Sequence, residues 1–257
     1  RKARQRIRSL KRLNPSSVLV VTGCYAENSS EILKKMPEVD LVVGNTQKNH
    51  LISKVIEKFY PNADDNSLFP QFHLSDFSAR NRAMVKIQEG CDQVCSYCIV
   101  PKVRGREKSI PINQVVNKIN TLNDLSYREV VLTGTQLGTY GFDLDHTSIV
   151  DLISMIIEKT NIPRIRVSSL QPHEITDDLL KLWENERLCP HFHIPLQSGS
   201  DSILKNMRRR YSSSTFISSL ENVKSQVSDV AITTDIIVGF PGETLEDFKQ
   251  TQDICVR

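Results

Sequence analysis

The chain contains 257 residues, of which 39% are hydrophobic and 25% are charged. This length fits one large domain or two of ordinary size, and the composition is typical of a soluble globular protein. No apolar run approaches the length of a membrane span and no signal peptide opens the chain. We therefore expect a cytoplasmic protein with no membrane partner.

The first thirteen residues predict a basic helix. Four apolar residues follow the spacing of one helix face: Ala3, Ile7, Leu10 and Leu13. Seven of the first twelve residues are Arg or Lys and none is acidic, whereas the rest of the chain carries a net charge of −4. A local basic patch attracts a phosphate backbone, although a solvated helix face would carry the same charges. We take Arg4 and Arg8 in this helix as candidate RNA contacts.

Residues 1–60 predict part of an open α/β layer. After the basic helix we expect two strands and two helices in alternation, at Val18–Val21, about 28–36, 41–43 and about 47–59. This series is short for a complete domain, and we expect that it began before Arg1. The stretch that follows, residues 61–82, is rich in Pro, Asn, Asp and Ser and has no hydrophobic period, so we expect a linker there.

A second α/β series occupies residues 83–257. Its apolar runs predict five strands, at 83–87, 129–133, 164–168, 191–196 and 230–238. Helical periods separate them, at about 112–124, 148–159, 176–186, 200–208, 213–226 and 244–255. Five successive strand–helix units predict a parallel barrel or partial barrel, in which the chemistry lies at the carboxyl ends of the strands.

Three cysteines follow the first strand of this series with the spacing C-x3-C-x2-C: Cys91, Cys95 and Cys98. Three thiolates can bind an iron–sulfur cluster that normally takes four cysteines, leaving one iron open to a ligand. A structural zinc site is the alternative, with Cys189 and His191 or His193 completing the ligands. A disulfide does not suit the cytoplasm that we expect. Cys189 and Cys255 fit no motif, and His191 and His193 are more simply core residues of a strand.

Each later strand of the series ends in polar or glycine-containing sequence rather than in a simple turn. The second is followed by Gly134 and Thr135, the third by Ser168, and the fourth by Gln197. The fifth ends at Gly239, where a helix N-terminus that favours anionic groups begins. Glycine clusters are weak signals individually, but their recurrence at successive strand ends predicts one binding site.

Together these stretches resemble the radical S-adenosylmethionine (SAM) methylthiotransferases. The motifs that carry the resemblance span most of the chain: Val21–Ala26, Val42–Asn45, Gly90–Gly105, Leu196–Ser200 and Gly239–Thr244. The resemblance implies an α/β fold in which a truncated N-terminal domain precedes a (β/α)6-type partial barrel. It also implies an enzyme that replaces a C–H group by C–SCH3, using a 4Fe–4S cluster, SAM and a radical derived from SAM.

The resemblance further implies roles for the motif residues. Cys91, Cys95 and Cys98 would hold the cluster that binds SAM, and Tyr97 would lie beside the adenine of SAM. Contacts to SAM would come from the strand ends, at Gly134, Thr135, Ser168, Gln197 and Gly239. Cys24 matches the third ligand of the family's auxiliary 4Fe–4S cluster, whose other ligands would precede Arg1. Arg104, Arg106 and Arg209 are further candidate tRNA contacts.

Within the family, the sequence is most similar to the enzymes that act on N6-threonylcarbamoyladenosine beside the tRNA anticodon. The partners implied are tRNA and an electron donor such as flavodoxin or ferredoxin. An isopentenyladenosine-specific or ribosomal-protein methylthiotransferase is the alternative within the family, and a zinc-stabilised RNA-binding module is the alternative outside it. The sequence contains no segment that resembles the family's last barrel strand or its C-terminal RNA-binding β-domain. We therefore expect a fragment that lacks full activity.

Overall fold

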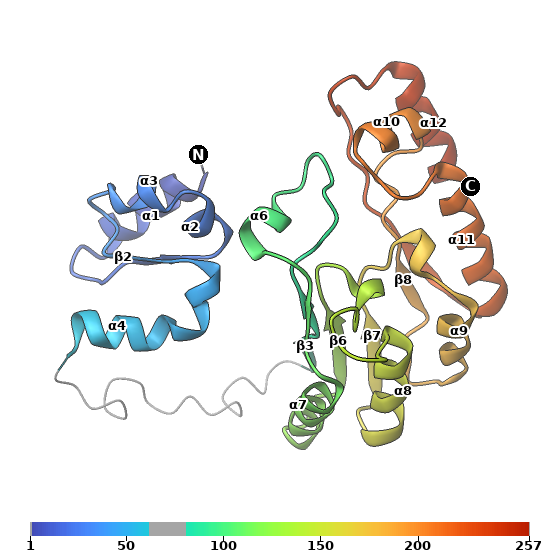
Figure 1. The fold of residues 1–257 in the computed structure, drawn as a ribbon, viewed down its shortest axis with the longest axis horizontal. Coiled ribbons are helices and arrows are strands. Elements are labelled where there is room, and N and C mark those ends of the chain that lie inside the picture. The colour runs from blue at the N-terminus through green and yellow to red at the C-terminus, as the bar shows by residue number, and fades with distance from the viewer. Residues whose placement is uncertain (1, 62–80, 257) are drawn as a thin grey trace. The chain divides into compact units, whose positions relative to one another are not determined.

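The computed structural model describes residues 2–61 and 81–256, which form two compact units (Figure 1). One consists of residues 2–61 together with Ile99–Gly105, and the other of residues 81–98 and 106–256. Almost all of the expected linker lies outside the described residues. The sequence places Ile99–Gly105 with the barrel, but in the structure this segment packs with the first unit. The Asn45 side-chain amide contributes to that packing by donating to the Val103 carbonyl at 2.7 Å.

The first unit is a small α/β layer built on two parallel strands, β1 (Val20–Thr22) and β2 (Leu41–Val43). The other elements are α1 (Lys2–Leu13), α2 (Cys24–Asn28), α3 (Ser30–Lys34), η1 (Asn45–His50), α4 (Leu51–Phe59) and α6 (Val100–Arg104). The helix expected at 28–36 is instead two short helices, because the backbone leaves the helical region at Ser29. The buried core consists of Ile7, Ala26, Leu33 and Met36.

The second unit contains five parallel strands in chain order, which confirms the predicted α/β partial barrel. One sheet holds β3 (Arg82–Lys86), β6 (Glu129–Thr133) and β7 (Arg164–Val167), and a second pair is β8 (His191–His193) with β9 (Ala231–Thr233). A parallel bridge between Ser169 and His193 joins the two groups. Figure 1 shows β3, β6, β7 and β8 in this order, so successive strand ends are neighbours.

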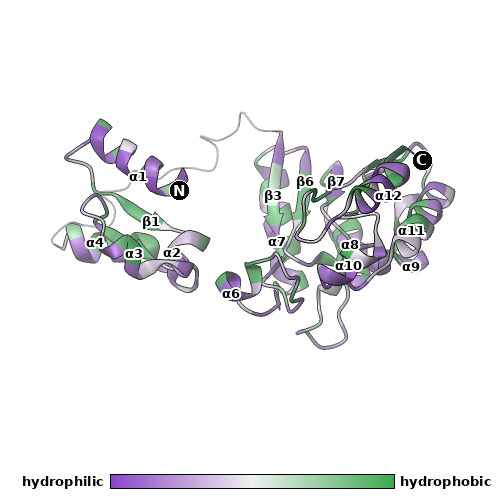
Figure 2. Ribbon diagram, turned by 90° about the horizontal axis from the view of Figure 1, so that it is seen from above, coloured by the Kyte–Doolittle hydropathy of each residue, from purple (hydrophilic) through white to green (hydrophobic). Residues whose placement is uncertain are grey.

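Helices cover the strands and bury the main hydrophobic core. They are α7 (Ile112–Asp124), α8 (Ile149–Lys159), α9 (Asp177–Leu180), α10 (Asp201–Asn206), α11 (Ser213–Gln226) and α12 (Leu245–Val256). Leu152, Ile153 and Ile156 of α8 pack in the same core as Leu132 of β6. In Figure 2 the apolar colour is prominent on α8, whereas α1 is mainly hydrophilic. None of the helices in the described residues is both long and apolar enough to span a membrane.

The segment between β4 (Gln88–Glu89) and β5 (Lys108–Ser109), residues 90–107, contains the three cysteines and is called the cysteine loop. The two short strands that close it were not expected from the sequence. They pair in antiparallel fashion. Three further short 3-10 helices follow strands or helices: η3 (Leu137–Thr139), η4 (Pro172–Glu174) and η5 (Lys181–Glu184). The β4–β5 pair fixes both ends of the loop, so the three cysteines belong to a closed structure at the carboxyl end of β3.

Candidate metal centre in the cysteine loop

The cysteine loop is held in place largely by its own backbone. Cys91 and Cys95 are each only 8% exposed, whereas Cys98 is exposed. The Cys98 amide donates to the Cys95 carbonyl at 3.1 Å, and the Gln93 amide donates to the Cys91 sulfur at 3.4 Å. Gly90 precedes the first cysteine with a φ of 78°, which glycine adopts at little cost. The three thiols therefore lie on one short turn, two facing inward and one reaching the surface.

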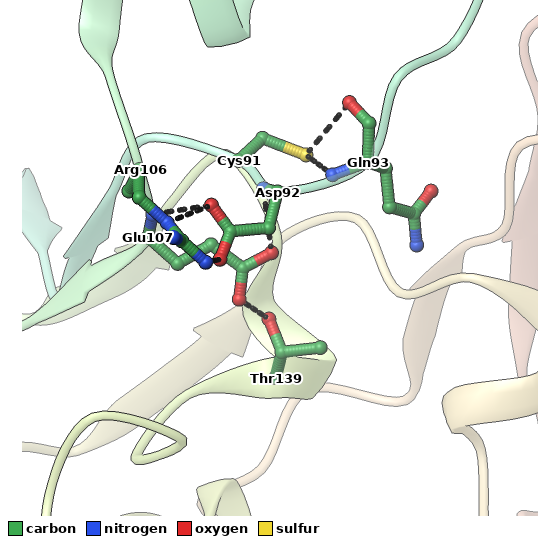
Figure 3. A network of polar contacts seen from close by, with 6 residues as sticks. All are labelled: Cys91, Asp92, Gln93, Arg106, Glu107 and Thr139. Carbon is green, nitrogen blue, oxygen red and sulfur yellow. Dashed lines mark hydrogen bonds and ion pairs between the residues drawn. The ribbon is translucent and has the colours of Figure 1, made fainter.

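A polar network ties this loop to η3, the 3-10 helix that follows β6 (Figure 3). Arg106 donates to both carboxylate oxygens of Asp92, at 3.2 and 3.0 Å. The Asp92 amide donates to one oxygen of Glu107 at 3.1 Å, and Thr139 donates to the other at 2.6 Å. Since the Arg106 side chain is 85% exposed, its pairing with Asp92 adds little stability. The prediction that Arg106 contacts RNA therefore stays open.

Three cysteines on one loop are a donor set that suits an iron–sulfur cluster. Across residues 2–61 and 81–256, no three or more His, Cys, Asp or Glu side chains converge as the ligands of one ion. In a cluster each cysteine binds a different iron, so the thiolates stand farther apart than around one zinc. Burial raises the pKa of Cys91, as do Glu107, Cys95 and Cys98, so these groups are near neighbours. The described residues give no support to the zinc alternative.

Unpaired polar atoms beside the loop are consistent with a bound group. Among the described residues, the side-chain nitrogen of Gln93 and the hydroxyl of Thr135 are buried without a hydrogen-bond partner. The Thr135 amide donates to Gln88 at 2.8 Å, which fixes the backbone after β6. A Cβ at Gly134 would lie 2.8 Å from Leu137 and 3.0 Å from the Gln88 amide oxygen, so the chain passes too closely there for a side chain.

The other predicted cofactor contacts lie beyond the ends of neighbouring strands. The Ser168 amide, just after β7, donates to the Leu132 carbonyl at 3.1 Å. Gln197 has a φ of 64°, and its amide donates to the Asp235 carbonyl at 2.8 Å. Gly239 has a φ of 70°, and its amide donates to Glu243 at 2.5 Å. Tyr97 of the cysteine loop is 40% exposed. These placements leave the predicted contacts to SAM as predictions.

Arg209 is half-buried rather than fully exposed, and its predicted contact with tRNA stays a prediction. Its guanidinium donates to the Cys95 sulfur at 3.3 Å and to the Gln171 side chain at 2.9 Å, and it lies 4.8 Å above the Tyr211 ring. The basic run Arg208–Arg210 looks like surface charge in the sequence. The structure corrects this interpretation, because the middle arginine turns inward onto the cysteine loop.

The sequence analysis also missed a chain of polar side chains that runs from Arg209 to Glu174. Gln171 donates to the Gln136 amide oxygen at 2.6 Å, and Gln136 in turn donates to the Glu174 carboxylate. Burial raises the pKa of Glu174 to about 7, against the lowering effect of these donors and of Arg209. The signal in the sequence was a glutamine after each of two strands, which is too common to distinguish from a turn.

In the first unit, Cys24 is the first residue of α2 and follows Gly23, whose φ is 96°. Its thiol accepts a long hydrogen bond of 3.8 Å from the Asn45 amide. A hydrogen bond from Arg104 lowers the pKa of Cys24, which favours the thiolate that a metal requires. The structure thus places Arg104, predicted to contact RNA, beside a candidate cluster ligand.

The basic face of α1 is open in the first unit. Arg4 and Arg8 are exposed, and Arg8 makes only a loose ion pair of 3.6 Å with Glu38. Lys11 pairs with Asp40 at 2.9 Å, and the pKa of that carboxyl is lowered by a hydrogen bond from the Leu19 amide and by Lys11. The exposed arginines have the position that a phosphate-binding surface needs, although the placement does not distinguish it from a solvated helix face.

Comparison with known families identifies the second unit. The profile of the radical SAM superfamily matches residues 85–255, and that of the uncharacterized protein family UPF0004 matches residues 1–44. The chain belongs to the radical SAM superfamily. The match begins in β3 and includes the cysteine loop and the four later parallel strands of the second unit, within the residues that the sequence assigns to the partial barrel.

Named relatives cover almost the whole chain. A protein of Chlamydia pneumoniae is 39% identical over 96% of this chain and 57% of its own length, and one of Bacillus subtilis (strain 168) is 37% identical over 98% and 58%. Both are named threonylcarbamoyladenosine tRNA methylthiotransferase MtaB. A tRNA-2-methylthio-N(6)-dimethylallyladenosine synthase of Methylacidiphilum infernorum is 38% identical over 95% and 56%. The chain thus spans less than two thirds of the length of these relatives.

A solved structure supports the fold alone, because its sequence is distant. The cobalamin-dependent SAM radical enzyme OxsB with aqua-cobalamin bound gives a TM-score of 0.68 at 13% identity, covering 98% of this chain and 41% of that one. The radical SAM methyltransferase TsrM of Kitasatospora setae, with tryptophan and a SAM analogue, gives 0.59 at 15% identity, covering 70% and 34%. Superfamily and fold therefore agree with the partial barrel.

Proposed function

We propose that the protein is a radical SAM tRNA methylthiotransferase that converts N6-threonylcarbamoyladenosine, next to the anticodon, to its 2-methylthio derivative. The observation that carries this proposal is the closed C-x3-C-x2-C loop at the carboxyl end of the first barrel strand. Two relatives named for this substrate, 39% and 37% identical over 96% and 98% of the chain, support the choice of substrate.

In this proposal Cys91, Cys95 and Cys98 would hold a 4Fe–4S cluster, and residues after the neighbouring strands would bind SAM. When bound, the cluster and SAM supply the one-electron chemistry that replaces a C–H bond of adenine by C–SCH3. The protein would bind and orient them: the unpaired Thr135 hydroxyl offers a hydrogen bond, and the backbone before it is fixed where Gly134 packs against Leu137 and Gln88. Tyr97, Ser168, Gln197 and Gly239 would complete the border of the site.

The first unit would serve the second cluster and the RNA. Residues 1–60 would belong to the N-terminal methylthiotransferase domain, with Cys24 as one ligand of an auxiliary cluster. Its lowered pKa supports this role, since a thiolate is the form that binds iron. The exposed face of α1, with Arg4 and Arg8, would attract the tRNA backbone. Flavodoxin or ferredoxin would donate electrons, and the cytoplasm, where tRNA is modified, would be the compartment.

A second candidate substrate is tRNA that carries N6-dimethylallyladenosine. Relatives named as synthases of its 2-methylthio form are 36–38% identical to this chain, which is almost as similar as the relatives named for threonylcarbamoyladenosine. The two substrates differ only in the group on N6 of the adenine, and no residue of the structure is assigned to that group. The two substrates therefore have to be compared directly.

The test is a reaction of the protein, expressed as its gene encodes it and reconstituted anaerobically with iron and sulfide. It would be incubated with SAM, a reductant and tRNA that carries either nucleoside, and the digested tRNA analysed by mass spectrometry. We expect the methylthio product from threonylcarbamoyladenosine and none from a Cys95→Ala control. Product from the dimethylallyl substrate alone would replace the substrate proposal, and product from neither would contradict the proposed function.

A further inference from the structure

We propose that Arg209 is a positioning residue for the cluster, because its guanidinium donates a hydrogen bond to the Cys95 sulfur and so favours the reduced form of the cluster. The inference rests on the cluster-binding part of the proposed function and is independent of the tRNA substrate. From its sequence context, Arg209 would be a surface charge. In the structure its side chain faces the candidate metal site.

The geometry brings a permanent positive charge onto one candidate ligand. One terminal nitrogen of Arg209 lies 3.3 Å from the Cys95 sulfur and 3.5 Å from the Tyr97 hydroxyl, and the other lies 2.9 Å from the Gln171 amide oxygen. Cys95 is only 8% exposed, so little water competes for its sulfur. The third guanidinium nitrogen, Nε, is buried without a partner among the described residues, which leaves one donor free beside the loop.

Tyr211 and Gln171 hold this guanidinium from two sides. The Tyr211 ring lies 4.8 Å below the guanidinium, a distance at which the ring face attracts a cation. The ring is itself fixed, because its hydroxyl donates to the Pro195 carbonyl at 2.6 Å. Gln171 is fixed in turn by its hydrogen bond to Gln136. The arginine is therefore preorganised rather than free to swing into solvent.

The backbone around Arg209 is also joined to the cysteine loop. The Ser96 amide donates to the Met207 carbonyl at 3.1 Å, and the Ser96 hydroxyl donates to the Asn206 carbonyl at 2.9 Å. Arg208 then turns the chain with a φ of 58°, and the Arg209 amide donates back to the Leu204 carbonyl at 2.9 Å. These hydrogen bonds hold the end of α10 against the cysteine loop. The backbone therefore fixes the position from which Arg209 reaches Cys95.

The electrostatic consequence follows from the charge of each redox state. Reduction adds one negative charge to a cluster, and a nearby guanidinium stabilises that charge because it remains protonated at any working pH. Hydrogen bonds to the sulfurs are one of the factors that set the reduction potential of an iron–sulfur cluster. Arg209 is therefore expected to raise the potential, which makes the cluster easier to reduce.

The experiment compares three variants of the reconstituted protein: Arg209→Gln, Arg209→Lys and, as a matched control, Arg210→Gln. Arg210 is exposed and carries the same charge one residue away. Iron content and thermal unfolding are measured first, and the reduction potential is then obtained by titration followed by electron paramagnetic resonance. We expect Arg209→Gln to keep its cluster and to shift the potential to a more negative value. Arg209→Lys should give an intermediate potential, because it keeps the charge without the planar fork, and Arg210→Gln should leave it unchanged.

An unchanged potential in Arg209→Gln, or an equal shift in Arg210→Gln, would overturn the inference, as would a wild-type chain that takes up no cluster. If Arg209→Gln does not hold its cluster, Arg209→Lys decides: a potential more negative than that of the wild type supports the inference, and an equal one overturns it. A protein that shows the expected shifts but forms no methylthio nucleoside would contradict the proposed function alone.

Discussion

The carboxylate of Glu174 lies at one end of the polar chain that reaches Arg209. The pKa of Glu174 is raised from 4.5 to about 7, mainly by burial and to a smaller extent by the Glu107 charge, against the lowering effect of Gln171, Gln136 and Arg209. Burial prevails because an ion loses more hydration than two amide donors replace. The residue type alone would give an ordinary surface acid, so its chemistry comes from neighbours that are distant in sequence.

This raised pKa predicts a stability that depends on pH. Because the folded pKa of about 7 exceeds the ordinary 4.5, folded Glu174 holds a proton that the unfolded chain has released. The contribution is complete below pH 4.5 and is lost as the pH rises to about 7, for a total of about 3 kcal/mol. Denaturant unfolding at pH 5 and pH 8 should show that this loss is smaller in Glu174→Gln than in the wild type. Equal losses in both proteins would contradict the raised pKa.

At the scale of residues, the sequence is enough to propose the cysteines as ligands. It does not show which side chains lie beside them in the fold. The spacing of Cys91, Cys95 and Cys98 is a local pattern and is visible in one short stretch. Arg209 meets Cys95 across more than a hundred residues, and that contact depends on how α10 packs on the loop. The spacing of residues along the chain was therefore enough to propose Cys91, Cys95 and Cys98 as metal ligands, whereas only the fold could identify the group that contacts Cys95.

At the scale of elements, a clear apolar face made the predictions reliable. The bounds of α7 and α11 are those expected, and β6 has the expected residues, because each has a buried pattern that spans the whole element. The β4–β5 pair was not predicted, since its two-residue strands have no period and exist only through mutual pairing. The helix expected at 176–186 continues beyond Leu180 as a 3-10 turn, a difference that apolar periodicity does not resolve.

Helix α8 offers a test of how local sequence sets an element. Ser148 caps its N-terminus, because its hydroxyl accepts from the Asp151 amide at 3.2 Å while Asp151 accepts from the Ser148 amide at 2.8 Å. Ser148→Ala removes one half of this capping box and should lower the free energy of unfolding by about 1 kcal/mol. Ser148→Thr, which can form the same bond, is the matched control. An alanine variant as stable as the threonine variant would contradict this role of the cap.

For the whole molecule, the order of strands and helices was predictable, and the assignment of segments to units was not. Five strand–helix units were expected in the second unit and its described residues contain five parallel strands, because each strand–helix unit has its own hydrophobic signature. The sequence kept Ile99–Gly105 with the barrel, since the segment follows Cys98 directly. Its packing beside Asn45 depends on a hydrogen bond between residues 58 positions apart, which no local pattern reveals.

The central claim is that the cysteine loop holds a cluster whose open iron binds SAM. The most direct measurement is electron paramagnetic resonance of the anaerobically reconstituted and reduced chain, with and without SAM, beside Cys91→Ala, Cys95→Ala and Cys98→Ala. The account predicts a 4Fe–4S signal that SAM alters, and its loss in each variant. A signal that SAM leaves unchanged, or a SAM-responsive signal that persists in all three variants, would contradict it.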